Sequence, residues 1–294
     1  MPRYSYVNGQ YIPHGDAVVH IEDRGFQFAD SVYEVVALID GRFADIVGHL
    51  DRLERSLSEL RMPMPMPRRA LELAMAETVR RNRIRNGAIY MQVTRGVAPR
   101  DFKFPKKASS SLVMTVRPVT YDMEERKKIC RAAVTVPDIR WQRRDIKTTG
   151  LLAQVLAKQS AVDKGAFEAW MVDEKGFVTE ASSSNAWIVD KSGNLITRPA
   201  AGNMILKGVT RSAMQALCKK NKIKLIERPF SVKESYQAKE AFTSAATALI
   251  VPITSIDGKK IGDGKIGKLT AEILDMYFAY ASDSASKQFH WSPL

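Results

Sequence analysis

The sequence has little cysteine and no long apolar run, and each shortage limits what the protein can be. Its 294 residues include two cysteines, Cys130 and Cys218, which do not form a Cys-x-x-Cys pair. The chain begins without the basic, apolar and small-residue pattern of a secretory signal peptide. No segment approaches the roughly 20 apolar residues that a membrane-spanning helix needs. We therefore expect a soluble protein in a reducing, cytoplasmic environment, without a membrane partner.

Common catalytic motifs are missing as well. The sequence has no Walker phosphate loop, no Gly-x-Ser-x-Gly elbow and no His-Glu-x-x-His motif, and its four histidines, among them His290, stand alone. Metal and serine-hydrolase functions therefore lack support. Residues 262–267 match Gly-x-Gly-x-x-Gly, but a dinucleotide-binding unit needs a helix and then another strand, and this chain ends soon after one helix. We interpret the stretch as a turn that leads into the last helix.

Basic residues outnumber acidic ones, which gives a formal net charge of +13 and a pI near 9.7. Such a charge suits nucleic-acid binders and also enzymes that act on anionic small molecules. The densest basic cluster lacks a zinc-finger, helix-turn-helix or aromatic RNA-binding signature, so we interpret it as a solvated helix face. It consists of Arg61, Arg68, Arg69, Arg80, Arg81, Arg83 and Arg85. We expect no nucleic-acid partner, and a basic nucleic-acid binder is kept only as a third hypothesis.

Turn residues and hydrophobic spacing predict a mixture of strands and helices. Asn8-Gly9 and Asp40-Gly41 each separate two strand patterns, which predicts two hairpins because these residues tolerate positive φ. Leucines recur at helical spacing between residues 50 and 60 and mark a buried helix face. Further strands are expected at residues 89–95, 112–119, 132–139, 169–172, 185–189 and 240–243, and further helices at residues 69–81, 151–165, 210–222 and 269–281.

The composition, with 45% hydrophobic and 26% charged residues, is typical of a globular protein of this length. We expect two domains with a boundary near Thr120. Residues 1–120 form a small N-terminal domain, and residues 121–294 form a larger domain. Within the first, residues 96–105 are too rich in proline and charge for a regular element, and we interpret them as a functional loop.

Lys147 lies where the predicted strand at residues 132–139 gives way to a predicted helix. Such junctions are common positions for reactive groups in α/β enzymes, and Thr148 or Thr149 is expected to cap the helix that follows. Most lysines are solvated surface residues, so position alone does not establish a role.

Three further features carry polar chemistry. Residues 207–210 place a glycine, Gly208, and a hydroxyl cap, Thr210, at the start of a helix, where free N–H groups and the helix dipole favour a phosphate. Glu180 precedes a run of serines in a predicted turn between strands. Arg52 lies beside the leucine face of its helix rather than squarely on the polar side.

Taken in order, Arg52, Lys147, Glu180 and the helix start at residues 208–210 resemble fold-type-IV pyridoxal-phosphate enzymes. Within that group the chain is most similar to the D-amino-acid aminotransferases. Their signature stretches resemble residues 22–35, which begin Glu22-Asp23-Arg24, and residues 92–100, which end Pro99-Arg100. The similarity covers roughly residues 4–280. It implies the two-domain fold of that group, of the α+β or α/β class, with a small α/β N-terminal domain and a larger β-rich C-terminal domain.

The resemblance also implies a role for each site residue. Lys147 would form the Schiff base with pyridoxal 5'-phosphate and then move a proton, which a primary amine can do. Glu180 would keep the ring nitrogen protonated, so that the ring withdraws electrons from the substrate. Arg52 and the helix start would hold the phosphate, and Leu206 would pack against the ring. The complete predicted cofactor set is Arg52, Lys147, Glu180, Ser182, Ser183, Ser184, Leu206, Gly208, Val209, Thr210, Ser244, Ala246 and Thr247.

For the substrate, the resemblance implies a homodimer in which the loop of one subunit completes the site of its neighbour. Tyr33 and Arg100 match the residues that bind the substrate carboxylate in the family. The family's histidine, two positions after the arginine, is replaced here by Phe102. We expect a weaker grip on the carboxylate and a broader range of acceptors.

The leading hypothesis is a transaminase that moves the amino group of D-amino acids such as D-alanine to 2-oxo acids such as pyruvate or 2-oxoglutarate. Alternatives of the same fold are an R-selective amine transaminase, which Phe102 favours, and a branched-chain aminotransferase. A lyase that cleaves aminodeoxychorismate is a further alternative, because it would need Lys147 and Glu180 but not Arg100.

Overall fold

The computed structural model describes residues 2–286; Met1 and residues 287–294, with His290 and the polar tail, lie outside the described residues. The chain forms two compact units. Of the described residues, the first unit contains 2–121, the segment Ile146–Gly150 and 281–286, and the second contains Asp122–Asp145 and Leu151–Tyr280. Among the described residues, no helix is long and apolar enough to cross a membrane.

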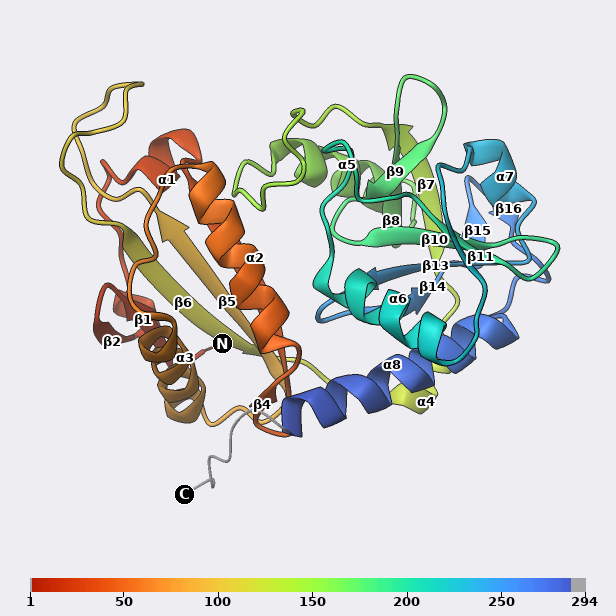
Figure 1. The fold of residues 1–294 in the computed structure, drawn as a ribbon, viewed down its shortest axis with the longest axis horizontal. Helices are drawn as coiled ribbons and strands as arrows, with labels where there is room; N and C mark the ends of the chain where they lie inside the picture. Colours follow the sequence, from red (N-terminus) through yellow and green to blue (C-terminus); the bar gives the residue numbers. More distant parts are fainter. Residues whose placement is uncertain (1, 287–294) are drawn as a thin grey trace. The chain divides into compact units, whose positions relative to one another are not determined.

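The first unit is built on a six-stranded antiparallel sheet with the order β2-β1-β6-β5-β3-β4 (Figure 1). Both predicted hairpins are confirmed, because Asn8 and Gly9 turn at φ 47° and 95°, and Asp40 and Gly41 at 49° and 82°. The strands are β1 (Tyr4–Val7), β2 (Gln10–Pro13), β3 (Ser31–Ile39), β4 (Arg42–Phe43), β5 (Gly87–Thr94) and β6 (Ser111–Pro118).

Two helices of the first unit, α2 (Ile46–Glu59) and α3 (Arg68–Asn82), pack against this sheet (Figure 1). The predicted leucine face of α2 is confirmed, since Leu50 and Leu53 are buried in the core that α2 shares with the sheet. A short helix, α1 (Arg24–Phe28), and a 3-10 turn, η1 (His14–Asp16), were not expected from the sequence.

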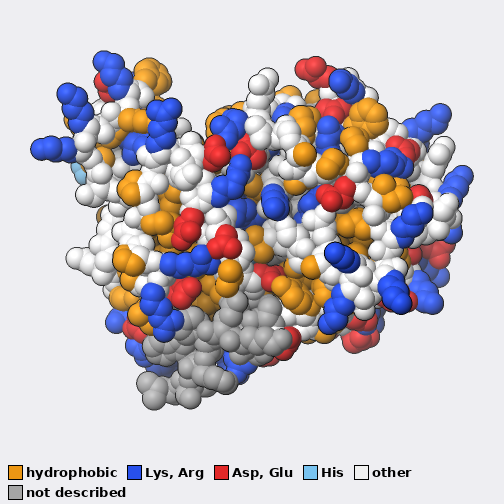
Figure 2. Space-filling model, viewed as in Figure 1, with side chains coloured by type: hydrophobic (Ala, Val, Ile, Leu, Met, Phe, Trp, Pro, Cys, Tyr) orange, Lys and Arg blue, Asp and Glu red, His pale blue; other side chains and the backbone are white. Residues whose placement is uncertain are grey.

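The arginine-rich face of α3 is partly exposed, and its arginines form ion pairs. Arg80 and Arg81 both pair with Glu77, at 2.6 and 2.7 Å, and Arg68 pairs with Asp51 on α2 at 2.6 Å. Basic side chains are spread among acidic ones over the face drawn in Figure 2. This arrangement supports a solvated helix face rather than a nucleic-acid stripe.

The second unit contains two five-stranded sheets, with the orders β12-β11-β10-β13-β14 and β16-β15-β7-β8-β9. Both mix parallel and antiparallel neighbours. Trp170 on β8 and Trp187 on β10 are fully buried in it. The strands are β7 (Ala132–Pro137), β8 (Glu168–Val172), β9 (Val178–Ala181), β10 (Asn185–Val189), β11 (Leu195–Thr197), β12 (Leu225–Glu227), β13 (Glu240–Ala245), β14 (Leu249–Pro252), β15 (Ser255–Ile256) and β16 (Lys259–Lys260).

The helices that follow are α4 (Met123–Lys128), α5 (Leu152–Asp163), α6 (Val209–Lys220), α7 (Val232–Tyr236) and α8 (Lys268–Ser286). Gly262 and Gly264 have positive φ values of 57° and 82° in turns that lead into α8. No strand follows α8 within residues 2–286. The interpretation of residues 262–267 as turn residues is therefore confirmed.

The predicted helix caps are wrong. The N-cap of α5 is Leu151, without a side-chain hydrogen bond, because Thr148 forms a β-bridge with Val32 and Thr149 hydrogen-bonds to Ser31. The N-cap of α6 is Gly208, also without a side-chain cap. Each threonine that was expected to cap a helix is engaged in tertiary contacts instead.

Candidate active site

The predicted reactive lysine lies in the segment Ile146–Gly150, which packs with the first unit. The Tyr33 N–H donates to the Lys147 carbonyl at 3.0 Å, and the Thr149 N–H donates to the Ser31 carbonyl at 3.3 Å. The half-buried Lys147 is therefore fixed to the start of β3 rather than to the helix that follows it in sequence.

The amino group of Lys147 lies over an aromatic ring. Its Nζ atom is 4.0 Å from the centroid of the Tyr33 ring, which lies 5.7 Å from the ring of Tyr90. Gln92 is the register partner of Tyr33 and accepts a 2.7 Å hydrogen bond from the Tyr90 hydroxyl. Burial, with a contribution from Tyr33, raises the pKa of Tyr90 to about 12, so its phenol stays protonated at neutral pH. Polar groups thus share the sheet face that carries the lysine.

Arg52 is held by a buried carboxylate on the opposite side of β3. Its Nε atom donates to Glu34 Oε1 and its Nη2 atom to Glu34 Oε2, each at 2.7 Å. His49 Nδ1 lies 2.8 Å from Glu34 Oε2. Burial by itself would raise the pKa of Glu34, but the charge and hydrogen bonds of Arg52 and then His49 lower it to about 2. The phosphate contact of Arg52 stays a prediction. Arg52 would have to make it while it is paired with Glu34.

The predicted carboxylate-binding residues Arg100 and Phe102 are exposed on the loop between β5 and β6. The Arg100 guanidinium carbon is 5.2 Å from the ring centroid of Phe28 and 5.7 Å from that of Phe102. The two rings are 5.5 Å apart. Phe102, which replaces the expected histidine, therefore borders the arginine with an aromatic surface.

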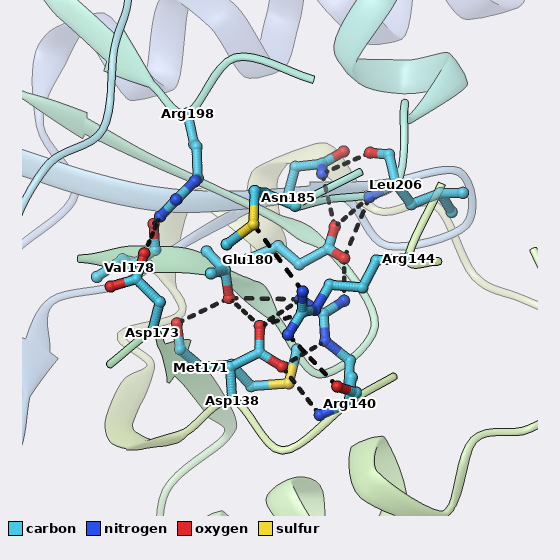
Figure 3. Close-up of polar contacts among 12 residues, drawn as sticks. Asp138, Arg140, Arg144, Met171, Asp173, Val178, Glu180, Asn185, Arg198 and Leu206 are labelled. Carbon is cyan, nitrogen blue, oxygen red and sulfur yellow. Dashed lines mark hydrogen bonds and ion pairs between the residues drawn. The ribbon is translucent and has the colours of Figure 1, made fainter. Parts of the chain in front are cut away.

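In the second unit, Glu180 is buried at the end of β9 and surrounded by donors (Figure 3). Arg140 Nη1 donates to Oε1, Asn185 Nδ2 donates to Oε2 at 3.0 Å, and the Leu206 N–H is 3.3 Å from both oxygens. Burial raises the pKa of Glu180 and the charge of Asp138 adds to this, although Arg140 and the Leu206 N–H act in the opposite direction. The effect of burial on the Glu180 pKa is thus larger than the combined effect of its donors.

Arg140 is shared between Glu180 and a second carboxylate. Its Nη2 and Nε atoms donate to Asp138 at 2.7 and 2.9 Å, and Arg144 approaches the same carboxylate at 3.4 Å (Figure 3). Burial works against ionisation of Asp138, yet the hydrogen bonds and charge of Arg140 lower its pKa. Asp138 therefore stays ionised, and its carboxylate competes with Glu180 for the guanidinium group of Arg140.

Asn185 joins Glu180 to the start of α6. Its Nδ2 atom also donates to the Leu206 carbonyl at 3.2 Å. A side chain at Gly208 would collide with Asn185 Oδ1, which explains the glycine at this position. The first N–H groups of a helix, here those from Val209 on, have no acceptor within the helix and suit an anion.

The hydroxyl groups of the predicted cofactor set are engaged within the second unit. Ser182, Ser183 and Ser184 all donate to the buried Glu168, with the last two at 3.5 and 3.3 Å. Their predicted contacts to the cofactor therefore stay a prediction.

The remaining predicted positions lie next to α6 and β10. Ser244 is the register partner of Asn185 and accepts a 2.9 Å hydrogen bond from the Trp187 indole. Ala246 and Thr247 are half-buried in the turn that follows β13. Thr210 is buried and accepts a 3.3 Å hydrogen bond from Tyr277.

Residues 31–256 match the family described as amino-transferase class IV. The chain belongs to this family. Membership confirms the predicted enzyme class, an aminotransferase that uses pyridoxal 5'-phosphate, with amino acids and oxo acids as its substrates.

Curated relatives of this class IV aminotransferase match it over nearly the whole chain. A D-alanine aminotransferase of Listeria innocua is 40% identical and covers 91% of this chain and 92% of its own. A D-alanine aminotransferase of Staphylococcus haemolyticus is 36% identical over 96% of this chain and 99% of its own.

Solved structures of similar fold confirm the predicted fold type. The branched-chain amino acid aminotransferase of Escherichia coli superimposes with a TM-score of 0.88 at 24% identity, over 99% of this chain and 98% of that one. The branched-chain aminotransferase of Thermoproteus uzoniensis gives a TM-score of 0.85 at 25% identity, with the same coverage.

The residues present fit pyridoxal phosphate. The start of α6 lacks a side-chain cap and can accept a phosphate. Glu180 is a buried carboxyl group, the chemistry that pairs with a protonated ring nitrogen. Lys147 supplies a half-buried primary amine. Arg140, Asn185 and Glu34 were missed by the sequence prediction, because only their tertiary contacts distinguish them from ordinary polar residues.

Proposed function

We propose that this class IV aminotransferase transfers the amino group of D-amino acids, such as D-alanine, to 2-oxo acids. The relatives that are 35–40% identical are D-alanine aminotransferases, whereas the branched-chain enzymes of similar fold are only 24–25% identical. The structural observation that carries the proposal is the link from Glu180 through Asn185 to the start of α6. This link supports the proposal because it connects an acidic side chain to the residues that precede a helix N-terminus suited to an anion.

Each site residue has a chemical task in this proposal. The cofactor, when bound, supplies an electron-withdrawing ring. Glu180 would keep the ring nitrogen protonated, and the N–H groups of Val209 and Thr210, with Arg52, would hold the phosphate. Lys147 would take the proton from the substrate Cα and would deliver it to the cofactor C4′ atom. Leu206 would pack against the ring.

Tyr33 and Arg100 bind the substrate carboxylate, with Arg100 supplied by the neighbouring subunit of a homodimer. The dimer is supported by large apolar side chains that are exposed on the single chain. Val18, Ile21 and Phe26 are 77%, 75% and 74% exposed, and Leu152 on α5 is 72% exposed. Sedimentation of the purified protein at twice the chain mass is expected, and a monomer at working concentrations would contradict the dimer.

The activity is tested with D-alanine and 2-oxoglutarate. Purified protein should release pyruvate from D-alanine, while L-alanine should be inert. The yellow absorption of the protein should bleach with the D enantiomer alone. A preference for L-alanine would refute the D specificity, and turnover of a chiral aromatic amine in place of D-alanine would favour the amine transaminase that Phe102 suggests. Pyruvate release without an amino acceptor would instead indicate a lyase.

The role of Lys147 is tested independently of turnover. Borohydride reduction followed by peptide mapping should place the label at Lys147. Lys147→Ala should lose at least about a thousandfold in activity, because no other group supplies the amine. The matched control is Lys164→Ala, a change at an exposed lysine after α5 that should retain full activity. Label at another lysine would sink the assignment.

The domain limits and the cellular location stay proposals. A small domain of residues 1–120 is supported by the first compact unit, which contains these residues. A larger domain of residues 121–294 is supported by the second unit, although the segment Ile146–Gly150 packs with the first. A cytoplasmic location is supported by Cys130 and Cys218, which are both free.

A further inference from the structure

The loop that carries Arg100 has almost no regular backbone structure to hold it. Between the end of β5 at Thr94 and the start of β6 at Ser111, the one β-bridge joins Val97 to Asp23. An arginine that must meet a carboxylate needs a loop of fixed shape, since a misplacement of about 1 Å can cost a hundredfold in rate. The side chains that hold this loop therefore determine how well Arg100 can act.

Asp30, directly before β3, accepts hydrogen bonds from two buried arginines. Its Oδ2 atom accepts from Arg24 Nε at 2.8 Å and from Arg95 Nε at 2.7 Å. Its Oδ1 atom accepts from Arg95 Nη2 at 3.0 Å. The three side chains are only 11%, 4% and 10% exposed, so water screens these ion pairs poorly.

Both arginines extend from Asp30 to the loop. Arg24 Nη1 donates to the Asp101 carbonyl at 2.6 Å, next to Arg100 in sequence, and the Arg24 N–H donates to the Gly96 carbonyl at 2.9 Å. The Arg95 guanidinium carbon lies 3.7 Å from the ring centroid of Phe104. The base and the far side of the loop are thus both tied to the same carboxylate.

The same cluster reaches the environment of Arg100 itself. The ring of Phe28 has the Arg24 guanidinium at 4.8 Å and the Arg100 guanidinium at 5.2 Å. At the base of the loop, Gly96 has a φ of 94°, and a side chain there would collide with the Ser109 carbonyl. The two ends of the loop therefore lie against each other at Gly96 and Ser109. The arginines bound to Asp30 hold the part of the loop between them.

We propose that Asp30 is a positioning residue for substrate carboxylate binding: by pairing with Arg24 and Arg95, it fixes the loop that presents Arg100. The inference rests on the proposed function, in which Arg100 binds the carboxylate. Without the Asp30 charge, two guanidinium groups would lie side by side unbalanced, and both would withdraw from the loop.

The test is Asp30→Asn in the full-length enzyme loaded with cofactor. The KM values for D-alanine and 2-oxoglutarate should rise about tenfold to a hundredfold, the range expected for lost charge-assisted hydrogen bonds. The kcat should fall less than KM rises, and the absorption band of the bound cofactor should be unchanged. An unchanged KM for both substrates would overturn the proposal.

A second readout does not depend on activity. Arg100, Lys103, Lys106 and Lys107 are trypsin sites within the loop. In Asp30→Asn, cleavage at these sites should accelerate about tenfold, because the loop opens more often. Equal cleavage rates in the variant and the wild type would overturn the proposal.

Two further variants control for misfolding. Arg24→Lys keeps a positive charge but cannot reach both Asp30 and the Asp101 carbonyl, so it should reproduce the rise in KM and in loop cleavage. Glu77→Gln is the matched control, because Glu77 also accepts from two arginines but on the exposed face of α3. It should change neither measurement; a rise in KM in Glu77→Gln equal to that in Asp30→Asn would contradict the specific role of Asp30.

The outcomes separate this inference from the proposed function. Wild-type enzyme that does not use D-alanine refutes the proposed function, and the trypsin comparison then still decides whether Asp30 holds the loop. Wild-type enzyme that uses D-alanine, with Asp30→Asn unaffected in KM, refutes the inference alone.

Discussion

The two compact units each contain a buried glutamate bound to an arginine, and the two carboxyl groups behave in opposite ways. Arg52 and His49 lower the pKa of Glu34 to about 2, against the effect of burial. Burial raises the pKa of Glu180 in spite of Arg140. Similar burial and a similar partner therefore do not fix the direction in which the pKa of a carboxyl group shifts.

The difference lies in how each arginine is shared. The Arg52 fork faces Glu34 with two hydrogen bonds, and His49 adds a third contact. Arg140 instead gives two donors to Asp138, whose negative charge also disfavours ionisation of Glu180. Glu34 therefore receives two hydrogen bonds from its arginine, whereas Glu180 receives one from Arg140.

The largest expected effect is on stability. Glu34→Gln removes the charge that balances Arg52 in the core, and we expect a loss of about 3–5 kcal/mol in the free energy of unfolding, measured by urea denaturation. Asp51→Asn, which breaks the exposed pair with Arg68, should cost less than about 1 kcal/mol. Equal losses in the two variants would show that the buried pair of Glu34 with Arg52 contributes no more to stability than the exposed pair of Asp51 with Arg68.

Glu180→Gln should show the reverse pattern. Activity with D-alanine should fall about a hundredfold, because the amide cannot hold the proton on the ring nitrogen. Stability should change by no more than about 1–2 kcal/mol, since Arg140 keeps its hydrogen bonds to Asp138. Single-turnover kinetics and urea denaturation measure the two quantities. A stability loss as large as that of Glu34→Gln would contradict the expected difference between the two glutamates.

His49→Gln sharpens the comparison by removing one contact of Glu34. We expect a loss of about 1.5 kcal/mol in the free energy of unfolding, the size of one hydrogen bond to a charged group. The control is His20→Gln, a change at an exposed residue. A loss within error of the control would assign the low pKa of Glu34 to Arg52 alone.

The two groups should also give pH dependences of opposite sign. Glu34 has a lowered pKa, so its stabilisation is complete above 4.5 and is lost as the pH falls toward 2, by at most about 1.4 kcal/mol per pH unit. Glu180 has a raised pKa, so the wild type loses stability relative to Glu180→Gln as the pH rises above 4.5. Urea denaturation of the wild type, Glu34→Gln and Glu180→Gln from pH 3 to 7 measures these slopes. The same pH dependence of the free energy of unfolding in all three proteins would contradict them.

Much of the fold could be predicted because its signals are local. Asn-Gly and Asp-Gly pairs tolerate positive φ values, which the turns at Asn8-Gly9 and Asp40-Gly41 require. The leucine face of α2 repeats every three to four residues. The family could be predicted because Lys147, Glu180 and the helix start at Gly208 are separate motifs in a fixed order.

The rest depends on contacts between distant residues. β15 and β16 have two residues each, too few to show a period, and β15 pairs with β7, more than 100 residues earlier. Asn185 is recognised as a site residue only by its contacts with Glu180 and Gly208, and no sequence spacing connects the three residues. Thr149 was expected to cap a helix because nothing local indicates its bond to Ser31.

The segment Ile146–Gly150 has a practical consequence for anyone who wishes to divide this chain. It belongs to the first unit, although the residues before and after it in sequence belong to the second. Ile146 fills part of the first unit's core. A fragment that stops at Tyr121 would therefore lack both a piece of its own interior and the amine of Lys147. Transplanting the lysine into another scaffold would require moving β3 along with it.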